Sequence, residues 1–292
     1  MRRAASLVEL LVAVGVLAVL TALLLPAVQK VRGAAVRADC GNRLRQLALA
    51  AHAHHDRAGA LPAGCTPAGP MRWATWLTRL LPDLGREAEW GEARVDYALL
   101  PSPFAPPHRN LARPVDAFRC PSQSVLVLET LAGRRAAVTT YLGVTGEFRP
   151  GRPGPAGPLP GAFGVGRGVR LAEVTDGLSA TLLAGERPAG ADPHLGWWYA
   201  GVGQAGDGSA DALLAVHESA RSPRLDACPA GQYRFGDGDP ADPCDLLHFW
   251  SSHAGGAHFA LCDGSVRFLS YAADPVLAAL ATRAGGEPVE VP

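Results

Sequence analysis

A nearly unbroken apolar run from Leu10 to Val28 constrains this chain more than any other feature, because Thr21 is its only polar side chain. As a helix, this run rises about 28 Å, which is close to the thickness of the hydrocarbon core of a bilayer. A cleavable secretory signal has a shorter apolar region, followed by small residues at a cleavage site. Arg2 and Arg3 precede the run, and positive residues of this kind stay on the cytoplasmic side. The sequence therefore predicts a membrane-spanning helix with a cytoplasmic amino terminus.

Glu9 stands at the start of this run, where burial of a carboxylate is costly. The segment Ala4-Ala5-Ser6-Leu7-Val8-Glu9-Leu10 resembles the processing site of type IV prepilins, which carry a small residue before the cut, then an apolar residue, Ser or Thr, Leu, Ile or Val, and Glu. The resemblance implies that prepilin peptidase cuts between Ala4 and Ala5 and that the new amino group is methylated. It also implies that Glu9 neutralises the amino terminus of a neighbouring subunit. Prepilins usually carry Gly before the cut and Phe after it, and this chain has alanine at both positions. The alternative is an uncleaved signal anchor.

The charge of the chain argues against a nucleic-acid-binding protein, and its composition predicts many loops. The chain has 27 Lys and Arg against 27 Asp and Glu and no basic stripe, which argues against nucleic acid as a partner. Its 292 residues suffice for one large or two small domains, and its 34 glycines and 25 prolines predict many turns and long loops.

The cysteines exclude some metal and redox sites and suggest one disulfide. None of the six forms a C-x-x-C pair, so zinc-ribbon and thioredoxin-like sites are excluded. An even number of cysteines in an exported chain permits disulfides. Cys228 and Cys244 flank a single irregular loop and are the expected pair, because closing such a loop contributes about 3 kcal/mol in the chain-entropy model. The pairing of the other four stays open.

Hydrophobic periodicity predicts the elements that follow the apolar run. Apolar residues at loosely helical spacing continue the first helix until Gly59 and Pro62. A short helix is expected at 73–81, stopped by Pro82, and an irregular proline-rich loop at 99–121. Strands are expected at 124–128, 139–144, 169–174, 180–186 and 197–201.

A β-hairpin at 257–269 is the clearest local pattern. Asp263-Gly264 is expected to form a two-residue turn in which both residues have positive φ. This turn sets the register, which pairs Cys262 with Ser265, Leu261 with Val266, and Phe259 with Phe268. The last two pairs then share one face of the hairpin.

Several segments together resemble one bacterial family, whose members join a prepilin-type segment to a carboxy-terminal motif of His, nine residues and Asp-Gly. Here His253 is followed after nine residues by Asp263-Gly264. Phe118-Arg-Cys-Pro-Ser122 and Tyr141-Leu-Gly-Val-Thr-Gly146 resemble further segments of that family. The resemblance implies a pilin-like α+β fold, in which a long amino-terminal helix lies half in the membrane and half on an antiparallel β-sheet domain with long loops. The biochemical role of this family is largely unassigned.

The same resemblance divides the chain into four parts. These are a leader peptide at 1–4, a transmembrane prepilin-type segment at 5–29, a periplasmic continuation of the helix at 30–60, and a β-rich pilin-like domain at 61–292 that ends in the hairpin. We expect a single-pass protein of the bacterial inner membrane, with its carboxy-terminal domain in the periplasm or outside.

Two groups of residues could bind metal. His52, His55 and Asp56 share one helix face, with His54 beside them, so they could chelate a transition metal or form a solvated helix end. Four aspartates of one loop could offer oxygen ligands to calcium: Asp237, Asp239, Asp242 and Asp245. Their spacing is not that of an EF-hand, and aspartate is also a common loop residue. We expect neither group to hold a metal.

Trp197 and Trp198 could form a platform for a sugar. Adjacent residues of a strand point to opposite faces, so at most one of the two is expected in the core. The other would then be covered by a loop or would anchor an interface.

His253 and Asp263 belong to the family motif. A catalytic pair needs a nucleophile, and no nucleophile elbow or similar motif marks one. We therefore expect Asp263 to shape the turn and His253 to make a structural hydrogen bond, and we expect no catalytic residues and no cofactor.

The leading hypothesis is a structural or assembly subunit of the envelope that resembles type IV pilins and the pseudopilins of type II secretion. It would be processed by prepilin peptidase and would pack with itself or with other pilin-like subunits. The first alternative is a membrane-tethered module that binds envelope polysaccharide or an exported protein. The second alternative is a tethered hydrolase that uses His253 and Asp263.

Overall fold

The computed structural model describes residues 7–129, 133–148, 160–190, 192–287 and 289–292. Ala4, Ala5 and Ser6 of the expected processing site lie outside the described residues. The chain consists of two compact units, Met1–Asp39 and Cys40–Pro292. The second unit therefore begins within the first helix.

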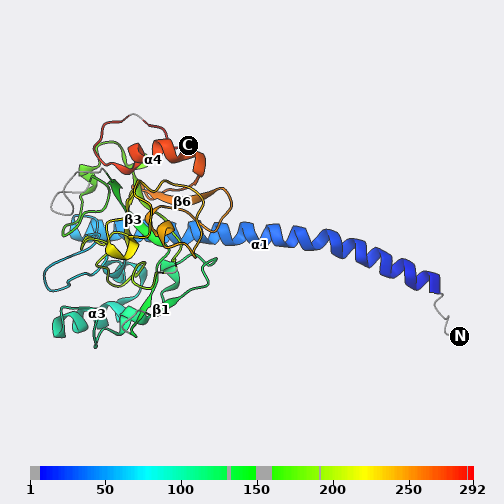
Figure 1. The fold of residues 1–292 in the computed structure, drawn as a ribbon, viewed down its shortest axis with the longest axis horizontal. Helices are drawn as coiled ribbons and strands as arrows, with labels where there is room; N and C mark the ends of the chain where they lie inside the picture. The colour runs from blue at the N-terminus through cyan, green and yellow to red at the C-terminus, as the bar shows by residue number, and fades with distance from the viewer. Residues whose placement is uncertain (1–6, 130–132, 149–159, 191, 288) are drawn as a thin grey trace. The chain divides into compact units, whose positions relative to one another are not determined.

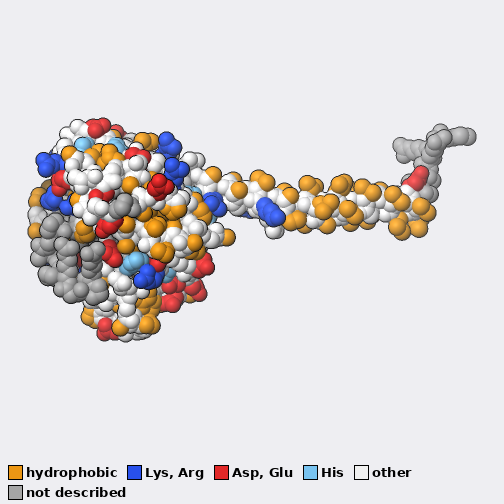
Figure 2. Space-filling view, turned by 90° about the horizontal axis from the view of Figure 1, so that it is seen from above, with side chains coloured by type: hydrophobic (Ala, Val, Ile, Leu, Met, Phe, Trp, Pro, Cys, Tyr) orange, Lys and Arg blue, Asp and Glu red, His pale blue; other side chains and the backbone are white. Residues whose placement is uncertain are grey.

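Helix α1 (Leu7–Ala58) supplies the first unit with its residues up to Asp39 (Figure 1). Among the described residues it is the one helix long and apolar enough to cross a membrane, and its most apolar window has no buried residue. Apolar side chains follow one another along it in Figure 2. The hydroxyl of Thr21 donates to the carbonyl of Leu17 at 2.8 Å, so this polar group is satisfied within the helix. The long apolar helix expected from the sequence is confirmed.

The last part of α1, from Cys40 onward, belongs to the core of the second unit. Leu44 and Leu47 are buried there, and the hydroxyl of Tyr141 donates to the carbonyl of Cys40 at 3.0 Å. The helix ends as expected at Gly59, whose φ of 77° is in the left-handed region and whose N–H donates to the carbonyl of His55 at 2.7 Å. Glycine reaches this conformation without the penalty that a β-carbon brings.

A five-stranded sheet with the order β5-β3-β4-β6-β7 forms the centre of the second unit (Figure 1). Its strands are β3 (Tyr141–Glu147), β4 (Leu182–Glu186), β5 (Leu213–Val216), β6 (Gly256–Leu261) and β7 (Val266–Ser270). All neighbours are antiparallel except β3 and β5, which are parallel. A separate two-stranded sheet pairs β1 (Val127–Glu129) with β2 (Arg135–Ala137). The α+β class is therefore confirmed, with a mixed sheet in place of a purely antiparallel one.

Helices lie on both faces of this sheet. Leu142 of β3 shares a core with Leu277 and Leu280 of α4 (Asp274–Ala281). The adjacent Tyr141 reaches the carbonyl of Cys40 in α1. Successive side chains of a strand point to opposite faces, so α4 covers one face and the carboxy-terminal part of α1 lies against the other.

The hairpin of β6 and β7 exists, but the expected register is wrong by one residue. The structure pairs Ala260 with Val266 and His258 with Phe268, and a three-residue loop of Cys262, Asp263 and Gly264 joins the strands. Of the two turn residues, only Gly264 has a positive φ, of 85°. A three-residue loop with a left-handed glycine is a common alternative to the two-residue turn. Because a one-residue shift exchanges the two faces, the expected shared face of Leu261, Val266, Phe259 and Phe268 does not form.

The other expected elements are found in part. The strands at 124–128, 139–144 and 180–186 correspond to β1, β3 and β4, and the helix at 73–81 is shortened to α2 (Trp76–Arg79). The segment 169–174 contains the 3₁₀ turn Leu171–Glu173 in place of a strand, and the carboxylate of Glu173 accepts from the backbone N–H of Arg170 at 3.2 Å. Residues 197–201 make only isolated bridges. Helix α3 (Glu87–Leu99) and β5 were not expected.

The remaining helical segments are short 3₁₀ turns in the long connections. They are Pro82–Leu84, Arg109–Ala112, Asp116–Phe118, Leu171–Glu173, Leu178–Ala180, Pro223–Leu225, Pro243–Leu247 and Tyr271–Ala273.

Candidate functional site

His253 of the family motif lies in the loop before β6, and its side chain is buried. Its backbone N–H donates to the hydroxyl of Ser251 at 3.0 Å, which fixes the loop. Its ring Nε2 lies 3.4 Å from Sγ of Cys120 and 3.6 Å from Oε1 of Glu186. The motif histidine therefore points at a sulfur and a carboxylate from two distant parts of the chain.

Glu186 is the last residue of β4 and is buried, with 1% of its surface exposed. Its Oε2 accepts from the backbone N–H of His258 at 2.7 Å and lies 3.0 Å from Nδ1 of the same residue. Its Oε1 has no hydrogen-bond partner among the described residues, and it faces Nε2 of His253 at 3.6 Å, beyond hydrogen-bond distance. Burial alone raises the pKa of Glu186, but contacts with His253 and His258 outweigh it, so the pKa lies below its ordinary value. The site thus holds a buried carboxylate with one unsatisfied oxygen.

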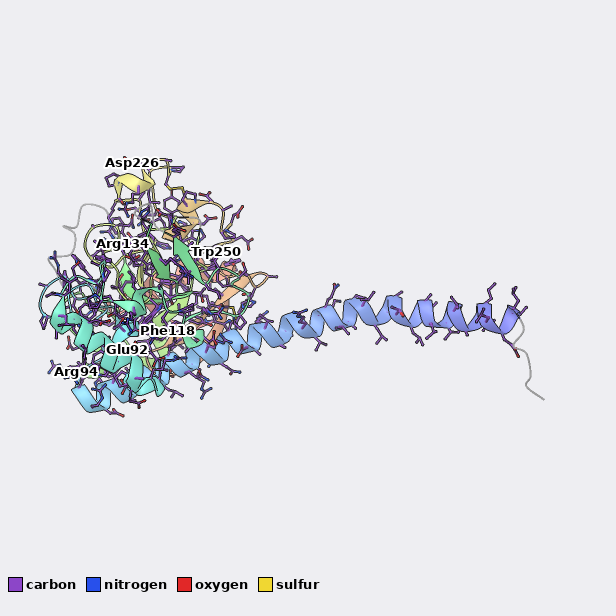
Figure 3. The ribbon with its side chains drawn as sticks, turned by 90° about the horizontal axis from the view of Figure 1, so that it is seen from below. Glu92, Arg94, Phe118, Arg134, Asp226 and Trp250 are labelled. Carbon is purple, nitrogen blue, oxygen red and sulfur yellow. A yellow bond between two sulfur atoms is a disulfide. The ribbon has the colours of Figure 1, made fainter. Side chains whose placement is uncertain are left out.

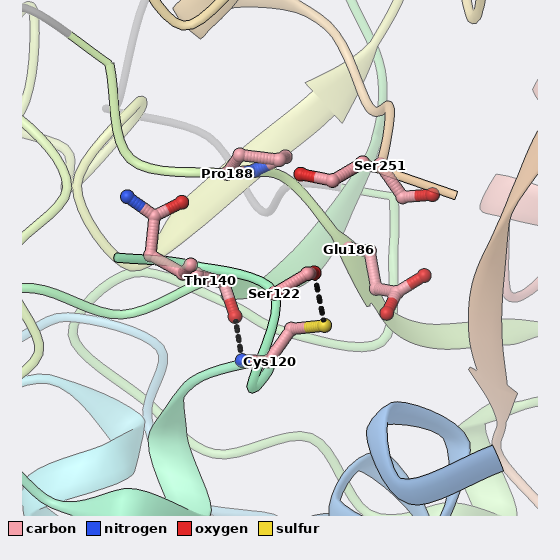
Figure 4. Close-up of a pocket in the computed structure, with 8 residues that line it drawn as sticks. Cys120, Ser122, Thr140, Glu186, Pro188 and Ser251 are labelled. Carbon is pink, nitrogen blue, oxygen red and sulfur yellow. Dashed lines mark hydrogen bonds between the residues drawn. The ribbon is translucent and has the colours of Figure 1, made fainter. Parts of the chain in front are cut away.

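A disulfide joins Cys40 of α1 to Cys120, with 4.9 Å between their Cα atoms. The backbone N–H of Cys120 donates to the hydroxyl of Thr140 at 2.6 Å, and Sγ of Cys120 lies 2.9 Å from the hydroxyl of Ser122 (Figure 4). One ligand-capable atom from each of Cys40, Cys120, Glu186 and His253 lies within 4.8 Å of the other three. Elements far apart in the sequence therefore bring two sulfurs, a carboxylate and an imidazole together.

A small pocket is lined by two of these four residues, Cys120 and Glu186. Figure 4 shows Cys120 and Glu186 on its wall, together with Ser122 and Ser251. Ser252 is also part of the wall, and both Ser122 and Ser252 are exposed at the surface. The pocket therefore joins exposed serines to two of the four residues, Cys120 and Glu186.

Asp263, the second residue of the family motif, lies at the other end of β6. The strand between them rises roughly 17 Å over its six residues, so His253 and Asp263 do not meet. The carboxylate of Asp263 is exposed and accepts from the backbone N–H of Ser265 at 2.8 Å. Asp263 therefore acts on the turn, and a catalytic pair of His253 with Asp263 is ruled out by position.

Ser251 lies two residues before His253, but its hydroxyl makes no hydrogen bond to the histidine ring. Its Oγ donates to the carbonyl of Gly256 at 2.7 Å and accepts from the backbone N–H of His253. Both contacts hold the loop in place, so this hydroxyl is committed to the backbone.

The four loop aspartates do not converge on a common point. Asp245 accepts from the backbone N–H of Asp239 at 2.6 Å, and Asp242 accepts from that of Cys244 at 2.8 Å. Asp245 also lies 2.9 Å from Nε2 of His248. Within the described ranges, Cys40, Cys120, Glu186 and His253 are the only group of three or more such ligands that converges. The aspartates, including Asp237, are loop residues here.

The histidines near the end of α1 also do not converge on a common point, because each contacts a different neighbour. His54 lies 3.5 Å from a carboxylate oxygen of Asp83, and burial, followed by the charge of Arg57, lowers its pKa. Nε2 of His55 accepts from the backbone N–H of Leu171 at 3.3 Å. These side chains tie the end of the helix to neighbouring loops.

Both candidate tryptophans are buried, with exposures of 9% for Trp197 and 0% for Trp198. The ring N–H of Trp198 donates to the carbonyl of Arg113 at 2.8 Å, and its ring packs on Phe118, which Figure 3 labels, with centroids 5.1 Å apart. The expectation that at most one lies in the core is wrong, because these residues are not in a regular strand. No exposed aromatic platform forms from this pair.

Cys228 and Cys244, the pair expected from the sequence, form a disulfide with 5.5 Å between their Cα atoms. Cys65 and Cys262 are buried free thiols. Burial raises the pKa of each of these thiols to about 12, so they behave as small apolar side chains.

Sequence reasoning missed Glu186, His258 and the Cys40–Cys120 disulfide. One signal was available for Glu186, because a carboxylate that ends the apolar segment Leu182-Leu183-Ala184-Gly185 needs a partner when the strand is buried. His258 lies five residues after the motif histidine in the same segment. No pattern in the sequence indicated which of these residues would meet.

Comparison with known proteins gives one result for this chain. Residues 29–276 match the family described as "Protein of unknown function (DUF1559)". The match begins after the apolar run and contains the whole cluster of Cys40, Cys120, Glu186 and His253. No curated protein and no solved structure matches the chain. Because the match covers most of its length, the chain belongs to this family of proteins of unknown function.

Proposed function

We propose that this chain is a membrane-anchored structural or assembly subunit of the bacterial envelope, similar to pilins and pseudopilins, and that prepilin peptidase processes it between Ala4 and Ala5. The observation that carries the proposal is the amino-terminal part of α1. Large apolar side chains from Leu7 to Val31 are exposed along it. Apolar surface in water costs about 25 cal/mol per Å², so this segment needs a bilayer or other helices around it.

The same helix supports a role in assembly. Beyond Cys40 it supplies Leu44 and Leu47 to the core of the second unit, and the disulfide to Cys120 fixes it there covalently. An anchor that is one continuous helix with a core element suits a subunit that packs through its helix. A flexible linker would suit an independent tethered enzyme better.

Glu9 gives the proposal its specific chemistry. It lies in the first turn of α1 and is exposed there, next to the apolar segment. By its resemblance to prepilins, its carboxylate pairs with the amino terminus of an adjacent subunit once Ala5 is the first residue. A charge-assisted hydrogen bond of this kind contributes about 1.5–3 kcal/mol.

Crosslinking of the full-length protein in membranes tests this proposal. The variant Glu9→Leu should remain in the membrane fraction, but its crosslinked oligomers should fall roughly ten- to a hundred-fold, the factor that corresponds to the lost hydrogen bond. Thr21→Leu is the matched control, since Thr21 bonds within its own helix and its replacement should leave the oligomers unchanged. Crosslinked oligomers of Glu9→Leu at the wild-type level would remove the proposed role of Glu9 and the main support for a pilin-like subunit.

A further inference from the structure

We propose that Cys40, Cys120, Glu186 and His253 form a tetrahedral site for Zn²⁺ or a similar transition-metal ion once the Cys40–Cys120 disulfide is reduced. This inference is independent of the membrane-anchor proposal, because all four residues belong to the second unit. Two thiolates, an imidazole and a carboxylate are a donor set that suits Zn²⁺ and excludes the all-oxygen shells of Ca²⁺ and Mg²⁺.

Two of the distances between ligand atoms already match those of a tetrahedral site. Bonds of about 2.0–2.3 Å to a central Zn²⁺ place neighbouring ligand atoms about 3.3–3.8 Å apart. Nε2 of His253 lies 3.4 Å from Sγ of Cys120 and 3.6 Å from Oε1 of Glu186. His253 therefore already lies at a suitable distance from Cys120 and from Glu186, all four ligand atoms lie within 4.8 Å of one another, and after reduction the two sulfurs have to separate.

The unsatisfied oxygen of Glu186 is an independent sign of a ligand. A buried oxygen without a donor costs about 1–3 kcal/mol, more when it is charged, and such groups are rare in proteins. Oε1 of Glu186 is such an atom, and it is the oxygen that faces His253. His258 holds the other oxygen through its backbone N–H and its ring, which is how residues behind a metal ligand orient it. A metal ion would satisfy Oε1.

The reduction step balances with a dithiol as the co-reactant. Cys120 retains 6% of its surface and Cys40 none, so a thiolate of the dithiol attacks the sulfur of Cys120, and Cys40 leaves as a thiolate. The second thiol of the dithiol then displaces Cys120 and closes a new S–S bond in the reagent. Two electrons and two protons pass from the dithiol to the two cysteines, and Zn²⁺ replaces these two protons.

The exchange does not change the net charge of the buried site. With the disulfide, the cluster carries the single negative charge of Glu186. With Zn²⁺, two thiolates and the carboxylate give three negative charges against two positive ones, so the net charge is again minus one. Burial of charge is the main cost of such a site. Because the net charge is the same in both forms, replacement of the disulfide by Zn²⁺ adds no buried net charge. The metal would replace the disulfide as the bond between α1 and the segment of Cys120.

Cobalt binding to the full-length protein in detergent tests the proposal. The starting protein is the double variant Cys228→Ser/Cys244→Ser, so that reduction exposes only Cys40 and Cys120. It is reduced with a dithiol, desalted under argon and titrated with Co²⁺, followed by Zn²⁺. The reduced sample should bind one Co²⁺ per chain, with a thiolate-to-metal band and the strong visible bands of tetrahedral Co²⁺, and Zn²⁺ should remove both. The unreduced sample contains Cys65 and Cys262 as well and should show neither.

Ligand variants in the same background decide which residues bind. Cys40→Ser, which leaves one of the two thiolates, should weaken both the thiolate bands and Co²⁺ binding, and His253→Ala and Glu186→Gln should each weaken binding at least tenfold. His258→Ala, which removes only the residue that orients Glu186, should weaken it roughly ten- to a hundred-fold. If the reduced protein gives the spectrum of the unreduced one, or if Cys40→Ser binds as before, the proposed site does not exist. Because the first comparison uses no ligand variant, misfolding of a variant cannot hide that outcome.

Discussion

Glu186 accepts two hydrogen bonds from a single residue, because both the backbone N–H and the ring Nδ1 of His258 approach its Oε2, at 2.7 and 3.0 Å. An ionised carboxylate can only accept, so Nδ1 of His258 carries the proton. The two residues lie on neighbouring strands, β4 and β6, and the contact therefore adds a side-chain link to the backbone ladder. This link fixes the carboxylate beside the motif histidine.

The first prediction concerns the pH dependence of this buried carboxylate. Since the folded protein holds the pKa of Glu186 below its ordinary value, its contribution to stability is present above the unfolded pKa of about 4.3 and is lost as the pH falls through the folded pKa. Glu186→Gln should lower the free energy of unfolding by about 1–3 kcal/mol at pH ~7, with a smaller difference at pH ~4. Urea unfolding followed by tryptophan fluorescence measures both. A difference that is the same at the two pH values would contradict this account.

The two disulfides should differ in what they contribute. Cys40 and Cys120 are separated by 80 residues, and Cys228 and Cys244 by 16. In the chain-entropy model, the longer loop contributes about 1.4 kcal/mol more than the shorter one, at roughly 4.5 against 3 kcal/mol. The double variant Cys40→Ser/Cys120→Ser should therefore unfold at lower urea than Cys228→Ser/Cys244→Ser. The reverse order would show that the first disulfide does not constrain the unfolded chain as proposed.

The hairpin loop gives a third prediction. Asp263 accepts from the backbone N–H of Ser265, and Gly264 has a φ of 85°. Asp263→Ala should cost about 0.5–1.5 kcal/mol through loss of that hydrogen bond, and Asp263→Asn should retain most of it. Gly264→Ala should cost about 1–2 kcal/mol, because a β-carbon disfavours positive φ. Equal losses for the Ala and Asn variants of Asp263, measured by urea unfolding, would remove the hydrogen-bond explanation.

Helix α1 could be predicted from the sequence because the residues that determine it lie within the helix itself or directly after it. The apolar run and the stop at Gly59 lie within one element, and each follows from helix chemistry alone. The hairpin was found for the same reason, but its register was not. Every residue of β6 is buried, so no alternation of polar and apolar side chains marks its two faces, and Asp-Gly fits both a two-residue and a three-residue loop.

The site could not be predicted because it is built from distant segments. His253 was recognised from its motif, whereas Glu186 and Cys120 reach it only through the pairing of β4 with β6 and the placement of the loop after Phe118. Helix α3 was missed because it carries charged residues on much of its surface and buries only Ala93, Asp96 and Tyr97. Long-range pairing, which local patterns do not encode, therefore hid the site, and the weak apolar pattern of α3 hid that helix.

The mass of the mature protein, isolated from native membranes, tests the central proposal most directly. The account predicts a chain that begins at Ala5 and carries one added methyl group on its amino terminus. Loss of Arg2 and Arg3 would leave 25 cations against 27 acidic residues, a formal net charge of −2. The variant Ala4→Glu, which replaces the small residue before the cut, should retain its leader and serves as the control. Wild-type protein with an intact leader that begins at Met1 would contradict prepilin-type processing and leave α1 as a plain membrane anchor.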